Sequence, residues 1–153
     1  MGKFAEGTDV PVERSRNEIE NVLARFGADQ FMYGWRGEAA VIAFRAQGRH
    51  IRFLLPMPQA TDEAMTKTGR GQMRTGETLR RAVDQEKRRR WRALCLCIKA
   101  KLESVATGIE TFEDSFMAHV VLPTGETMSD HVRPLIAQAY ESGKMQPLLP
   151  HLQ

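Results

Sequence analysis

Residues 77–106, ETLRRAVDQEKRRRWRALCLCIKAKLESVA, decide the fold of this chain because they form a long run without glycine or proline. Apolar residues recur along the run in a stripe with three- and four-residue spacings: Leu79, Val83, Leu94, Ile98, Leu102 and Val105. This is the periodicity of one face of an α-helix. We therefore predict a single helix of about eight turns, which Gly108 ends.

The segment before this helix has the composition of β-strands. Three short stretches rich in aromatic and β-branched residues, Gln30–Trp35, Glu38–Ala46 and His50–Leu55, are separated by the turn sequences Arg36-Gly37 and Gln47-Gly48-Arg49. Pro56 and Pro58 close the block. The pattern predicts an antiparallel three-stranded meander.

Further elements are predicted on both sides. Helical spacing of apolar residues over 12–26 predicts an N-terminal helix that ends at Gly27. We expect Phe116–Leu122 to form a strand at the sheet edge or in a dimer, and Ser129–Glu141 to form a helix. The fold class is thus α+β: an N-terminal helix, a three- to four-stranded antiparallel sheet, a long basic helix packed on the sheet and a short C-terminal helix.

The 153 residues fit one domain, 1–153, with 42% apolar and 27% charged residues. Within it we expect a loose lead-in over 1–11, a mobile basic loop over 59–76 and an irregular tail over 144–153. No apolar run approaches the roughly 20 residues that span a bilayer, and the N-terminus lacks the apolar region of a secretory signal. These features predict a cytoplasmic protein with no membrane partner.

Charge is concentrated in one segment. Residues 67–101 hold twelve of the twenty-two Lys and Arg residues but only three of the nineteen acids, Glu77, Asp84 and Glu86. The segment therefore carries +9 (twelve minus three), whereas the rest of the chain carries −6 (ten minus sixteen). A separation of this kind indicates a localised contact with a polyanion.

A helical projection aligns part of this charge. At 100° per residue, Arg81, Arg88, Arg92 and Lys99 each project within roughly 20° of a common direction, in a row about 27 Å long. The predicted nucleic-acid-binding residues are these four with the loop and the centre of the helix: Lys67, Arg70, Arg74, Arg81, Arg88, Arg89, Arg92 and Lys99. Alternatively, the row is a solvated face, or it contacts an acidic protein or a second copy of the chain.

Aromatic and cysteine residues near the row have structural interpretations. Trp91 lies among the arginines, where we favour core packing over base stacking. Cys95 and Cys97 are the only cysteines, and we interpret them as buried thiols of a reduced protein. The charges around the second turn of the meander, Arg45 to Arg52, are interpreted as ordinary hairpin charges.

No catalytic motif is present in the sequence. The four histidines are scattered and no phosphate-binding glycine motif occurs, so we expect no catalytic residue, no metal site and no cofactor. One weak alternative is a divalent-metal nuclease site built from Glu110, Glu113, Asp114 and His119.

Two stretches, VPVERSRNEIENVLARFGADQFMYGW (10–35) and RRRWRALCLCIKAKLESVATGIETFEDSFMAHVVLPTGETM (88–128), resemble an uncharacterised family of small phage and prophage proteins. The resemblance implies a viral origin and the cytoplasm of a bacterial host, and it carries no functional residues. The order helix, three strands, long helix is also similar to that of double-stranded-RNA-binding domains, and the β-β-β-α core is similar to phage single-strand annealing proteins, although neither family's motif is present.

The sequence thus predicts a non-catalytic nucleic-acid-binding phage accessory protein, with DNA favoured over RNA. The first alternative is a phage adaptor or inhibitor that binds a host protein or forms a homodimer. The second is the metal-dependent nuclease.

Overall fold

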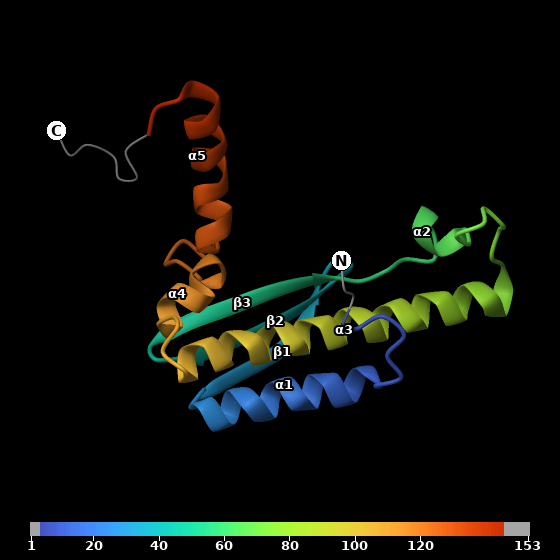
Figure 1. The fold of residues 1–153 in the computed structure, drawn as a ribbon, viewed down its shortest axis with the longest axis horizontal. Helices are drawn as coiled ribbons and strands as arrows, with labels where there is room; N and C mark the ends of the chain where they lie inside the picture. Colours follow the sequence, from blue (N-terminus) through green and yellow to red (C-terminus); the bar gives the residue numbers. More distant parts are fainter. Residues whose placement is uncertain (1–3, 146–153) are drawn as a thin grey trace.

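The computed structural model describes residues 4–145 and has the predicted α+β architecture (Figure 1). The three strands β1 (Gln30–Arg36), β2 (Ala39–Ala46) and β3 (Arg49–Pro56) form an antiparallel sheet in the order β1-β2-β3. Helices α1 (Val12–Phe26) and α3 (Gly76–Ala106) lie side by side along one face of the sheet. Each of these elements begins and ends within a few residues of its predicted bounds.

The turns of the meander have the geometry that their residues favour. Gln47 and Gly48 connect β2 to β3 with φ values of 50° and 73°, the left-handed pair of a tight two-residue hairpin. Gly27 ends α1 in the same region at φ 111° and donates to the carbonyls of Leu23 and Ala24. Local sequence therefore fixes where both helix and strands stop.

The core lies between the sheet and the two helices. Alternate residues of β2, such as Ile42 and Phe44, point to this side and meet Ile19 of α1 and Ile98 of α3. Trp91 of α3 is only 1% exposed, and its ring lies 5.5 Å from that of Tyr33, so core packing of this tryptophan is confirmed. The prediction of buried thiols is confirmed for Cys95 and wrong for Cys97, which is exposed.

The predicted strand at Phe116–Leu122 is wrong. Phe116 ends helix α4 (Phe112–Phe116), and the next residues form a 3-10 helix, η1 (Met117–His119). The phenyl ring of Phe116 packs edge-on against Phe44, and this core contact turns the chain away from an extended path. The extended part of the segment is limited to an isolated bridge between Val120 and Ile51 of β3, beside which Val121 N–H donates to His50 C=O.

Two segments extend beyond the sheet (Figure 1). The first is α2 (Glu63–Thr66) with the N-terminal turns of α3, and the second is α5 (Met128–Ser142), which has no fully buried residue. The connection over 59–76 thus contains a helical turn and a Lys67–Met73 bridge. Ala5 is buried within the predicted lead-in, and most of the predicted tail lies outside the described residues.

Within residues 4–145, no helix combines the length and apolar character needed to cross a bilayer.

Candidate nucleic-acid interface

Helix α1 packs against the side of α3 that carries the predicted basic row. The row begins at Arg81, and its second half, Arg92 and Lys99, reaches across to Glu18 of α1. Below these contacts the buried side chains of Ile19 and Leu23 join the core with Ile98. The row is therefore aligned as the projection predicts, but its C-terminal half borders a neighbouring helix instead of open solvent.

Glu18 is the centre of this contact. Its Oε2 accepts from Arg92 Nη1 at 2.8 Å and from Lys99 Nζ at 2.9 Å, and Arg14 Nε lies 3.7 Å from Oε1. The hydrogen bonds from Lys99 and then Arg92 lower the pKa of Glu18 from 4.5 to about 2. One carboxylate thus faces three cations.

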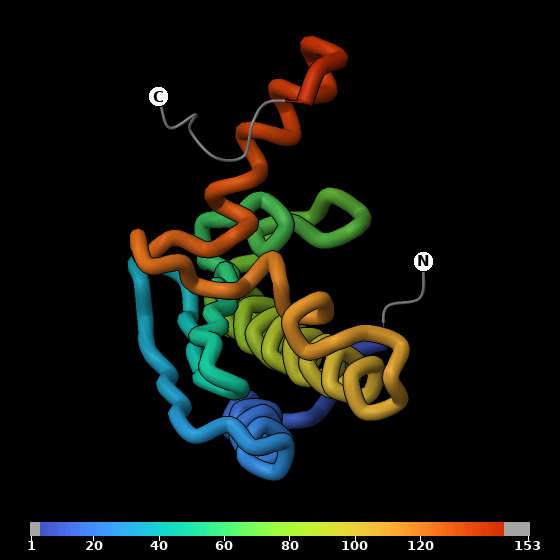
Figure 2. Tube along the Cα trace, turned by 90° about the vertical axis from the view of Figure 1, so that its left-hand side faces the viewer, coloured from blue at the N-terminus to red at the C-terminus, as the bar shows by residue number. Residues whose placement is uncertain are grey.

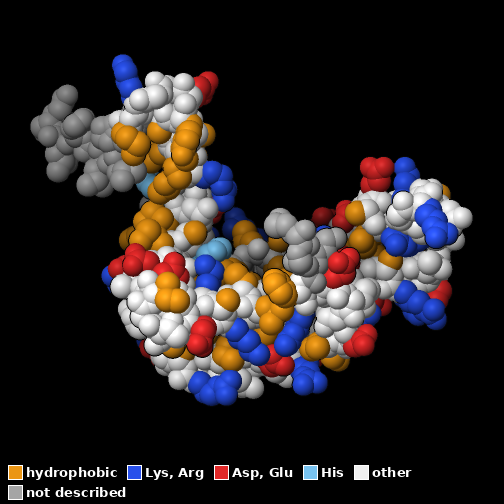
Figure 3. Space-filling model, viewed as in Figure 1, with side chains coloured by type: hydrophobic (Ala, Val, Ile, Leu, Met, Phe, Trp, Pro, Cys, Tyr) orange, Lys and Arg blue, Asp and Glu red, His pale blue; other side chains and the backbone are white. Residues whose placement is uncertain are grey.

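The surface around Glu18 is a shallow groove with excess positive charge, which we call the α1–α3 seam. Arg25 and Lys99 together line two adjoining hollows along it. The seam consists of four cations and two carboxylates: Arg14, Arg25, Arg92 and Lys99 with Glu18 and Glu103. Its net charge is +2 (four minus two), and Figure 3 shows Lys and Arg interspersed with acids over this helical layer.

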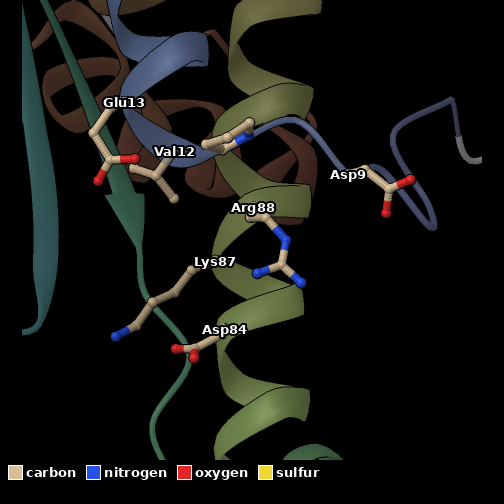
Figure 4. A pocket seen from close by; sticks show the side chains of 7 residues that line it. Asp9, Val12, Glu13, Asp84, Lys87 and Arg88 are labelled. Atoms are coloured by element: carbon tan, nitrogen blue, oxygen red, sulfur yellow. The ribbon is translucent and has the colours of Figure 1, made fainter.

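Arg88 lies near the N-terminal end of α1, where acids offset its charge. Figure 4 shows Lys87 and Arg88 projecting from α3, with Asp84 one turn away and Asp9 and Glu13 nearby. Three carboxylates and two cations line this pocket. A phosphate is therefore less favoured here than in the α1–α3 seam.

The loop cations divide into structural and exposed groups. The Arg74 guanidinium donates through Nη1 to the carbonyls of Ala64, Met65 and Lys67 at 3.0–3.3 Å, which ties the loop together. Lys67 pairs with Glu63 on the surface, and Arg70 is exposed with no ion pair to any residue that the structure describes. Arg70 and Lys67 are thus the accessible cations of the loop.

The remaining predicted residues pair within α3. Arg81 lies 3.4 Å from Glu77, and both side chains are exposed. Arg89 binds Glu86 through two nitrogens, and these bonds lower the pKa of the Glu86 carboxyl. The exposed Arg81–Glu77 pair is weak and leaves Arg81 able to exchange partners, whereas the Glu86 side chain that holds Arg89 is only 12% exposed.

The residues of the alternative nuclease site are separated by other contacts. Glu113 pairs with Arg49, Asp114 accepts from Thr111, and the His119 ring stacks on Phe53 at 4.0 Å. No group of three or more possible metal ligands occurs among the residues that the structure describes. The structure therefore does not assemble the carboxylates and the histidine that this alternative requires.

Sequence reasoning missed the contribution of α1. Arg14, Glu18 and Arg25 recur at spacings of four and seven residues, so one side of α1 carries all three. The same helical projection that aligned the row on α3 would have found them. A projection of a single helix does not show that α1 packs against α3, so it could not place these residues beside Arg92 and Lys99.

Comparison with known proteins gives no match to a family model, a curated protein or a solved structure.

Proposed function

We propose that this protein binds nucleic acid without catalysis, through phosphate contacts in the α1–α3 seam and from the loop cations Lys67 and Arg70. The supporting observation is that Arg14, Arg92 and Lys99 converge on one carboxylate. Lys and Arg side chains that exceed their local counter-ions are the usual means of holding a phosphodiester backbone. Recognition of this kind depends weakly on base sequence.

The test is fluorescence anisotropy with labelled single- and double-stranded DNA and RNA at about 50 and 200 mM salt. We expect a dissociation constant in the micromolar range or below at the lower salt, and at least tenfold weaker binding at the higher salt. No binding to any of the four probes at the lower salt would contradict the proposal.

The informative variants are those that keep the fold. Arg92 is only 19% exposed and holds Glu18, so its reversal would disturb the packing of α1. Arg14 and Arg25 are exposed, and we expect the double variant Arg14→Glu/Arg25→Glu to abolish binding while remaining folded. Arg133→Glu/Lys144→Glu makes the same change in net charge at exposed positions on and just after α5, and it should bind normally.

The loop has its own variant. Arg70→Glu/Arg81→Glu should weaken binding in part, because it removes exposed cations outside the seam. Equal binding by this variant and the wild type would restrict the contact to the seam. The phage origin and the adaptor alternative stay predictions. Excess heparin tests the adaptor alternative, because it competes with phosphate contacts for the cations but should leave a complex with a protein partner intact.

A further inference from the structure

Strand β1 is an open edge of the sheet. It lies at one end of the strand order, and Figure 2 shows it along the margin of the molecule. Met57 N–H donates to Glu38 C=O, so the backbone N–H and C=O groups of the even-numbered residues of β2 point toward β3. The backbone groups of its odd-numbered residues therefore point toward β1, as the Arg45 C=O does when it accepts from Asp29 N–H.

The register then assigns the free backbone groups of β1. Its even-numbered residues pair with the odd-numbered residues of β2, so Phe31, Tyr33 and Trp35 direct their N–H and C=O groups outward. Within residues 4–145, no backbone or side-chain group hydrogen-bonds to these outward groups. They form a row of donors and acceptors that matches a further strand.

The side chains of β1 do not oppose strand addition. Proteins commonly protect edge strands with a lysine, a proline or a bulge, and Phe31–Trp35 contains none of these. Instead Trp35 is 61% exposed on one face of the strand and Met32 is 56% exposed on the other. Exposed tryptophan and methionine are typical of the buried centre of an interface.

We propose that β1 is the dimerisation strand, and that it pairs antiparallel with β1 of a second copy. A two-fold axis at Tyr33 sets Phe31 opposite the partner's Trp35, and Met32 opposite the partner's Gly34. The same register sets Arg36 opposite the partner's Gln30, so no like charges are opposed within the paired β1 strands. Each outward-facing pair exchanges two backbone hydrogen bonds.

Antiparallel pairing about Tyr33 satisfies the outward backbone groups of both copies and opposes no like charges within β1, which is why we propose a second copy as the occupant. The pairing joins the three strands of each copy into one continuous sheet. Because the two-fold axis is perpendicular to that sheet, α1 and α3 of both copies lie on the same side of it. Dimerisation through β1 does not depend on nucleic-acid binding.

Analytical ultracentrifugation of the full chain at about 1–100 μM tests the proposal. We expect the wild type to reach twice the protomer mass of 17.3 kDa. Trp35→Lys and, separately, Met32→Lys should raise the dissociation constant at least tenfold, with unfolding by urea checked for each variant. The two side chains lie on opposite faces, so a folding defect in one variant leaves the other as a test.

The matched control is Tyr140→Lys, which replaces an aromatic residue that is 88% exposed on α5. It should leave the dissociation constant unchanged. A wild type that stays monomeric at the highest concentration would overturn the proposal. The proposal would also be overturned if Tyr140→Lys weakened the dimer and neither Trp35→Lys nor Met32→Lys did, because the contact would then lie on α5.

Discussion

Replacing Glu18 with glutamine should lower the stability of this protein and raise its affinity for nucleic acid. The carboxylate holds Arg92 and Lys99 against α1, and it also neutralises part of the positive charge of the α1–α3 seam. Glutamine keeps the size of the side chain and removes the charge. One variant therefore tests both roles of Glu18, the first by its stability and the second by its affinity for nucleic acid.

The loss of stability follows from the pKa of Glu18. Its fall from 4.5 to about 2 corresponds to an upper limit of about 3 kcal/mol at about 1.4 kcal/mol per unit. The Glu18 side chain is 26% exposed, so solvent and salt reduce the expected loss to about 1–2 kcal/mol. Because folding lowers this pKa, the contribution is complete above pH 4.5 and is lost as the pH falls toward 2.

The gain in affinity follows from the same charge. Without the carboxylate, Arg14, Arg92 and Lys99 have no acidic partner in this contact and can turn to phosphate. We expect binding about fivefold tighter at about 50 mM salt, which corresponds to about 1 kcal/mol. The salt dependence should steepen, because more counter-ions are released on binding.

Urea unfolding at several pH values between 7 and 2, together with anisotropy at two salt concentrations, measures both effects. Glu20→Gln is the matched control, since it removes the same charge from an exposed position on α1 outside the seam. If the stability difference between the wild type and Glu18→Gln does not shrink at low pH, the ion pairs of Glu18 with Arg92 and Lys99 do not stabilise the fold. A Glu18→Gln variant that loses stability and binds no more tightly would show that the seam is not the phosphate site.

Further predictions concern the core, the loop and the pH response. Ile98→Ala should lower the free energy of unfolding in urea by about 2–5 kcal/mol, whereas Ile136→Ala on the exposed helix α5 should change it by less than about 0.5 kcal/mol. Arg74→Ala should speed trypsin cleavage after Lys67 and Arg70 severalfold, because three loop carbonyls lose their hydrogen-bond donor. Arg80→Ala, at an exposed position, is the control. Equal cleavage rates in the two variants would show that other contacts hold the loop. Burial, and then repulsion from Lys101, lowers the pKa of His119 below 6.5, so its contribution to stability is complete above pH 6.5 and is lost as the pH falls further. His119→Phe should therefore lose less stability than the wild type between pH 7 and pH 5 in thermal unfolding, and equal losses would contradict this.

Most of the fold could be predicted because short-range signals determine it. The run without glycine or proline over 77–106 and the turn at Gln47-Gly48 leave few alternatives for α3 and the β2–β3 hairpin. The segment at Phe116–Leu122 is different, because its apolar composition fits either a strand or a buried turn. There the tertiary contact between Phe116 and the core decides, and local sequence does not contain it.

The candidate site could be predicted only in part, for a related reason. A helical projection shows that Arg81, Arg88, Arg92 and Lys99 share one side of α3, but it does not show which element packs there. Glu18 lies 74 residues from Arg92 along the chain, and only the packing of α1 brings the two together. The same packing gives Arg14 a place at the site, which the charge of residues 67–101 alone could not indicate.

The number of cations around Glu18 argues for a role beyond holding α1 to α3. One ion pair would be enough to satisfy a partly buried carboxylate, and each added cation introduces repulsion between like charges. Here Arg14, Arg92 and Lys99 share a single acid, and Arg25 adds a further charge along the same groove. Such an arrangement is stabilised when an external anion supplies the missing negative charge. A nucleic-acid backbone, whose phosphates repeat along the strand, is the anion that we propose.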